Sequence, residues 1–161
     1  MIDIELSLRH LAWSNQKVFT FFGTMPDEVF GWNVSENEWP IGRLLTHLAG
    51  SGEWYRYCLT GERWTDLPKV TSGAIALEYL PTIAALDDVL LQNLKLSDDE
   101  LEIKDGDGII HATRSLILSQ AVVHAAEHKA EIAAIMRLHG RHLDLDSLDV
   151  WSYAFELKNN Q

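Results

Sequence analysis

Two histidines four residues apart, His124 and His128, lie in the longest uninterrupted helical pattern of the chain, which runs from Ser119 to Gly140. Side chains at this spacing share one face of a helix, with Cβ atoms about 5–6 Å apart, so the two imidazoles can reach one point. They could hold a metal ion together. The spacing also arises easily by chance, and two exposed or hydrogen-bonded histidines would produce the same pattern. A metal site therefore needs a ligand from elsewhere in the chain.

The helix that carries this pair is predicted to run from about Thr113 to His139, with Gly140 just beyond its end. Residues at helical spacing form its predicted apolar stripe, namely Leu116, Val123, Ile132, Ile135 and Leu138. Four polar residues fall on or beside this stripe: Gln120, His124, His128 and Glu131. Polar groups that face inward need partners, which a metal ion would supply.

The candidate third ligand is His47, in a second predicted helix that begins at Pro40 and ends at Gly61. Three neutral imidazoles suit a divalent ion such as zinc or nickel and leave a position for water or substrate. A structural site would normally add a fourth ligand, often Cys, but the single cysteine, Cys58, is three helical turns from His47. The remaining histidines show no comparable pairing and are predicted to be surface or capping residues, namely His10, His111, His139 and His142.

Further helices are predicted from apolar residues at three- and four-residue steps. One covers about residues 2–22, and another has Pro81 near its first turn and a stripe from Ile83 to Leu94. Gly50 and Gly52 lie inside the helix of His47, where each costs about 1 kcal/mol relative to Ala, so they need a packing reason such as a nearby backbone. A short last helix in LDVWSYAFELK would pack Trp151 and Phe155 on the other helices.

Residues 97–112 interrupt this helical series. Alternating Leu101 and Ile103, then Asp-Gly, then two isoleucines indicate a short hairpin. The sequence therefore predicts a single all-α domain over residues 1–161, a four-helix bundle with a long crossover between its third and fourth helices and a short C-terminal helix.

The overall charge narrows the choice of partners. A formal charge of −11 and a pI near 4.9 argue against nucleic acid, because binding to phosphates depends on clustered Lys and Arg. The N-terminus is acidic where a signal peptide is basic, and no uncharged apolar run approaches about 18 residues, so we expect no membrane association. One cysteine in 161 residues favours the cytoplasm.

Two motifs give the chain a resemblance to a known family. IGRLLTHLAGSGEWY and VVHAAEHKAEIAAIMRLHG resemble the single-histidine and HxxxH motifs of the DinB-like metal-binding four-helix bundles, which are related to bacterial thiol-dependent S-transferases. LDVWSYAF is similar to the family's C-terminal segment, so the resemblance spans nearly the whole chain. The resemblance implies His47, His124 and His128 as a metal triad.

The chain departs from the family pattern around the last ligand. Glu127 replaces a histidine that many relatives have, and Lys129, Ala130 and Glu131 replace a common Arg-Gly-Gln. Glu131 lies three residues beyond His128 on the same face, where it could orient a ligand or act catalytically by taking a proton from metal-bound water. A solvated carboxylate paired with a nearby Lys or Arg would explain it equally well.

The resemblance implies an enzyme that transfers a low-molecular-weight thiol to an electrophile, in detoxification or a stress response. The same site could instead activate water for hydrolysis. A third alternative is a stress-associated metal-binding protein without catalysis, in which Trp32, Trp39 and Trp64 are exposed and meet a partner. The resemblance also implies a homodimer.

Overall fold

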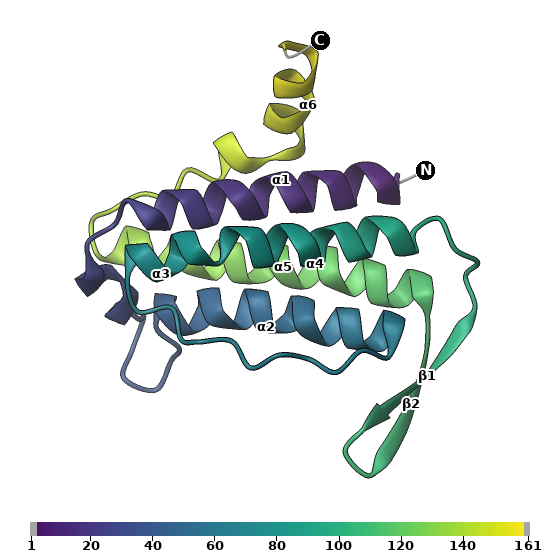
Figure 1. Cartoon of the computed structure of the whole chain (residues 1–161). Coiled ribbons are helices and arrows are strands. Elements are labelled where there is room, and N and C mark those ends of the chain that lie inside the picture. Colours follow the sequence, from purple (N-terminus) through teal and green to yellow (C-terminus); the bar gives the residue numbers. More distant parts are fainter. Residues whose placement is uncertain (1–2, 160–161) are drawn as a thin grey trace.

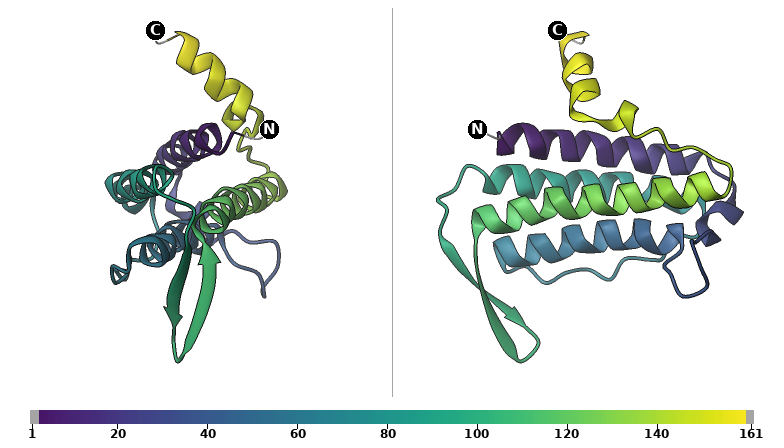
Figure 2. Two further views of the ribbon diagram at one scale, coloured as in Figure 1. Left: turned by 90° about the vertical axis from the view of Figure 1, so that its right-hand side faces the viewer. Right: turned by 180° about the vertical axis from the view of Figure 1, so that it is seen from behind.

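Four long helices lie side by side with roughly parallel axes in the computed structural model, which describes residues 3–159 (Figures 1 and 2). They are α1 (Ile4–Gly23), α2 (Ile41–Thr60), α4 (Leu80–Asn93) and α5 (Arg114–Leu138). Helices α1 and α2 each contact both α4 and α5. We call these four helices the helical body. The described part of the chain is thus mostly helical, as the sequence predicts.

The shorter elements lie at the ends of the helical body or project from it. They are η1 (Asp27–Gly31), α3 (Gly73–Glu78), the strands β1 (Glu100–Asp105) and β2 (Gly108–Thr113), η2 (Asp146–Leu148) and α6 (Val150–Asn159). The antiparallel strands pair Ile103 with Ile110 and confirm the predicted hairpin. Figure 1 shows that this hairpin extends away from the helices and joins α4 to α5.

The helix ends follow from their capping residues. The Asp3 side chain accepts hydrogen bonds from two backbone N–H groups of α1, and the Thr113 side chain accepts one from α5. Pro40 precedes α2, which ends at Gly61 in the left-handed region. The predicted third helix differs, because Tyr79 separates a short α3 from α4. The other predicted long helices are confirmed.

The buried face of α5 was only partly predicted. Ile132 and Ile135 are fully buried, but Leu116, Val123 and Leu138 are exposed. The face that packs is completed by Ile117, Leu118, Ala121, Ala125, Ala133 and Met136. Three of these residues are alanines, whose small side chains let neighbouring helices approach closely. A stripe assigned from the largest apolar residues therefore misses much of this face.

The predicted C-terminal helix is present as α6, but its packing prediction was wrong. Trp151 is 75% exposed and Phe155 is 59% exposed, whereas Tyr153 is buried. The Tyr153 ring lies 5.5 Å from that of Trp13, and Lys17 forms an ion pair with Glu156 at 3.0 Å. Figure 1 shows that α6 points away from the helical body, which agrees with the exposure of Trp151 and Phe155.

The helices between residues 3 and 159 include none that combines the length and the apolar character needed to cross a membrane.

Candidate metal centre

The structure brings together the three predicted ligands, His47 from α2 and His124 and His128 from α5. The Nε2 atom of His124 lies 3.0 Å from that of His47 and 3.1 Å from that of His128. One ligand atom from each residue falls within 4.8 Å of the other two. All three side chains are half-buried. The facing sides of α2 and α5 thus form a cluster of nitrogen atoms, which we call the histidine triad.

Glu131 fixes the orientation of one triad member. Its Oε2 atom lies 3.0 Å from Nδ1 of His128. A carboxylate accepts hydrogen bonds, so Nδ1 carries the hydrogen and Nε2 presents a lone pair to the other imidazoles. The contact lies where the predicted orienting role of Glu131 needs it, and that role stays a prediction. The carboxylate meets the ring nitrogen that does not face the triad, so the geometry gives no support to the predicted proton transfer.

Hydrogen bonding alone does not account for the triad. A ring nitrogen carries either one hydrogen or one lone pair. Because Nε2 of His128 presents a lone pair, one hydrogen on His124 would have to serve both His128 and His47. A cation at the point of convergence would instead accept three lone pairs at once. The donor set therefore fits a divalent ion bound by imidazole nitrogens.

The surroundings keep two of the imidazoles neutral, as metal binding requires. Burial, reinforced by His128 and His47, lowers the pKa of His124 to about 4. Burial also lowers the pKa of His47, with smaller contributions from His128 and Arg43. His47 and His124 can thus bind an ion at neutral pH without losing a proton.

Trp39 was predicted to be exposed, but it is half-buried and forms one wall of the site. Its ring meets that of His47 edge-on at 4.9 Å, and the guanidinium carbon of Arg43 lies 4.1 Å from its centroid. Trp32 is also half-buried, stacked on His139 at 4.6 Å, so only Trp64 is exposed as predicted. The available signal was the position of Trp39 next to Pro40, two helical turns before His47.

A cavity of about 880 Å³ borders the triad at His47. Trp39, Arg43 and Lys69 also line it. Its volume lies within the range of about 300–1,000 Å³ that is typical of small-molecule sites. Two cationic side chains and one acidic side chain, Asp27, thus line the cavity that borders the histidine triad.

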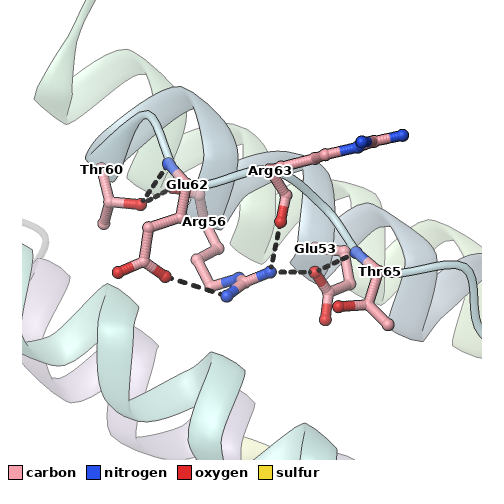
Figure 3. A network of polar contacts seen from close by, with 6 residues as sticks. All are labelled: Glu53, Arg56, Thr60, Glu62, Arg63 and Thr65. Carbon is pink, nitrogen blue, oxygen red and sulfur yellow. Dashed lines mark hydrogen bonds and ion pairs between the residues drawn. The ribbon is translucent and has the colours of Figure 1, made fainter.

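The segment that carries Lys69 is fastened along α2 by a polar network (Figure 3). Arg56 donates to Glu53 at 2.5 Å, to Glu62 at 2.9 Å and to the carbonyl of Arg63 at 3.1 Å. The backbone N–H of Thr65 donates to the same Glu53 oxygen at 3.1 Å. Because Glu53 is buried, this network fixes where the segment begins its path to the cavity.

A close approach at a glycine fixes the far end of that segment. A Cβ atom on Gly42 would lie 2.2 Å from the carbonyl oxygen of Val70. Val70 N–H in turn donates to Oγ1 of Thr46 at 2.9 Å. The expected backbone approach thus occurs at Gly42, whereas Gly50 has no neighbour within 4 Å and Gly52 meets only the Leu86 side chain.

The remaining histidines stay outside the triad, as predicted, but two have structural contacts. His10 is half-buried and donates from Nε2 to the carbonyl of Leu148 at 2.7 Å, and His139 stacks on Trp32. His111 and His142 are exposed. Cys58 is buried, which raises its pKa to about 11, so its thiol is a poor nucleophile.

Comparisons with known proteins agree with this architecture. The model of one family, described as the DinB family, matches residues 1–149. The crystal structure of a DinB-like protein from Bacillus cereus is similar, with a TM-score of 0.60 and 20% identity, over 82% of this chain and 87% of that chain. Likeness at this identity shows a shared fold only. No curated protein matches the chain.

Proposed function

Because this chain belongs to the DinB family, we propose that His47, His124 and His128 bind one divalent metal ion, zinc or nickel, and that the bound ion supports thiol transfer. The observation that carries this proposal is the convergence of three Nε2 atoms. That of His124 lies 3.0 Å from that of His47 and 3.1 Å from that of His128. The Glu131 contact to His128 adds the carboxylate partner that metal-ligating histidines typically have.

The number of ligands favours reactivity over a purely structural role. Within residues 3–159, the group of side chains that could hold an ion has three members. Structural zinc sites usually have four protein ligands, whereas catalytic sites have three and an open position. The nearby cavity gives a small molecule room to reach that position.

The chemistry that we propose is the transfer of a low-molecular-weight thiol to an electrophile. A divalent ion in the triad would lower the pKa of a thiol, which favours attack on an electrophilic carbon and release of a leaving group. Arg43 and Lys69 would attract anionic groups of the thiol, and Trp39 would exclude water from one side of His47. Glu131 would keep His128 in the tautomer that presents Nε2.

A thiol-consumption assay tests this function. Untagged protein loaded with zinc or nickel would be incubated with cysteine or glutathione and a panel of electrophiles, with the chelated protein as control. We expect metal-dependent loss of thiol that disappears in His124→Ala. An inert metal-loaded protein that loses thermal stability on chelation would instead indicate a metal-binding protein without catalysis, and turnover of esters or amides without thiol would indicate a hydrolase.

We further propose that the helical body is a four-helix bundle forming one domain, with the hairpin as part of its crossover.

The predicted homodimer and cytoplasmic location stay proposals. Exposed apolar side chains on α6, such as Trp151 and Phe155, support association of two copies. Sedimentation equilibrium of wild type and Trp151→Ser would test the dimer.

A further inference from the structure

A second cavity, of about 350 Å³, lies among α1, α5 and the segment that leads into α6. Most of its wall is apolar, with Leu11 from α1, Val122 from α5 and Leu145 and Leu148 from the C-terminal segment. No member of the histidine triad lines this cavity. Its size lies at the lower end of the range for small-molecule sites, about 300–1,000 Å³. The cavity is therefore a site in its own right, separate from the triad.

The cavity contains a buried amine. Lys129 lines it and is only 7% exposed. Its Nζ atom donates to Oγ of Ser14 at 2.6 Å, and that hydroxyl in turn donates to the carbonyl of Leu11 at 3.1 Å. An ammonium group has three hydrogens to donate. The single contact to Ser14 leaves capacity for a ligand at Nζ.

Lys129 also lacks a close counter-ion in the part of the chain that the structure describes. The ion pairs between residues 3 and 159 do not include it. Burial lowers the pKa of Lys129 to about 7, and the attraction of Asp87 opposes that shift only in part. Asp87 is itself bound by the Asn15 amide at 3.0 and 3.1 Å. A buried amine without a direct anionic partner is costly. An anionic group entering the cavity would supply that partner.

His10 holds the cover of the cavity in place. Its ring lines the cavity, and its Nε2–H donates to the carbonyl of Leu148 at 2.7 Å. Leu148 belongs to the segment that closes the cavity on the side of α6. Because this bond and the apolar contacts hold the segment of Leu148 in place, the cavity keeps its shape between α1 and α5.

We propose that this cavity binds a small carboxylic acid with an apolar body, such as a medium-chain fatty acid. The carboxylate lies against Nζ of Lys129 and the hydroxyl of Ser14, and the chain lies among Leu11, Val122 and Leu148. The bound pair is an ammonium and a carboxylate whether the amine is protonated before binding or takes its proton from the acid. This proposal does not depend on the function of the triad.

Calorimetric titration with octanoate, octanol and octylamine tests the proposal on the full chain, with and without zinc. We expect one octanoate per chain, bound at least tenfold more tightly than octanol, and no binding of octylamine, because a charge-assisted hydrogen bond contributes roughly tenfold or more. Octanol binding as tightly as octanoate, or no octanoate binding at millimolar concentration, would overturn the proposal.

Variants locate the site. Lys129→Met keeps the length of the side chain and removes the buried amine, so it should fold and bind octanoate no better than octanol. Val122→Trp should fill the cavity and abolish binding of both. Lys69→Met, a matched change at the other cavity, and His124→Ala should bind octanoate as wild type does. Unchanged binding in both Lys129→Met and Val122→Trp, or loss of binding in His124→Ala, would place the ligand elsewhere and refute the proposal.

Discussion

The Glu131 carboxylate lies 3.0 Å from Nδ1 of His128, the ring nitrogen that does not face the other two imidazoles. The two positions are three residues apart on α5, so both side chains share one helix face. The contact sets the hydrogen on Nδ1 and leaves the Nε2 lone pair for the triad. An acidic residue three positions after His128 thus acts on the triad through that histidine.

Replacing Glu131 by Gln should retain the ion at saturating metal but lower metal affinity or turnover. A residue that hydrogen-bonds a metal-binding histidine typically contributes about 10–100-fold to metal affinity or activity. Competition with a chromophoric chelator measures the affinity. Glu127→Gln is the matched control, because Glu127 is exposed on the same helix and should behave as wild type. Equal affinities of wild type and Glu131→Gln, together with equal turnover, would exclude this role for Glu131.

Asp87 should make stability fall as pH rises from about 4 to about 6. Burial raises its pKa to about 6 from an ordinary value of 3.8. The folded protein therefore holds a proton that the unfolded chain has lost in this window, so the unfolding free energy decreases with rising pH. Between these two pKa values, Asp87 lowers the unfolding free energy by roughly 1.4 kcal/mol for each pH unit.

Denaturant unfolding of chelated protein at several pH values tests this dependence. Asp87→Asn should remove the Asp87 contribution. The unfolding free energy of wild type minus that of the variant should therefore decrease as pH rises from about 4 to about 6. Asp88→Asn, at the exposed neighbouring position, should leave the wild-type slope unchanged. A difference between wild type and Asp87→Asn that is independent of pH would contradict the raised pKa.

Two glycines of α2 should respond oppositely to alanine. In Gly42→Ala the new Cβ would meet the Val70 carbonyl, so the segment along α2 must shift at a cost of roughly 1–3 kcal/mol. In Gly50→Ala the Cβ meets nothing within 4 Å, and helix propensity should stabilise the protein by about 1 kcal/mol. Thermal unfolding of both variants measures the difference. A stabilised Gly42→Ala would show that the segment is not held against the helix.

The histidine triad could be predicted from the sequence because helical spacing fixes His124 and His128 on one face. His47 was the candidate third ligand because it lies in another predicted helix of the bundle, and the resemblance to a family implied the full triad. Trp39 was missed because its role depends on how α2 meets α5, which no local pattern encodes. The same holds for Lys129, which is buried among α1, α5 and the C-terminal segment, elements that are far apart in the sequence.

The helices were predictable from capping residues and periodicity, but their buried faces were less so. Leu116 and Val123 follow the predicted stripe of α5 and are exposed, because Ala121 and Ala125 occupy the packed face. Small residues carry little hydrophobic signal even where they allow the closest packing. The orientation of α6 was likewise not encoded locally, since Trp151 and Tyr153 are both aromatic and only Tyr153 is buried.

Elemental analysis of protein purified without a histidine tag tests the central claim most directly. Wild type should contain about one equivalent of zinc or nickel per chain, and His142→Ala, a control at an exposed histidine, should contain the same. His124→Ala should contain almost none, because it loses one of three protein ligands, while its circular dichroism stays helical. Wild type that takes up no divalent ion even after incubation with excess metal, or His124→Ala that retains a full equivalent, would contradict a metal centre at the triad.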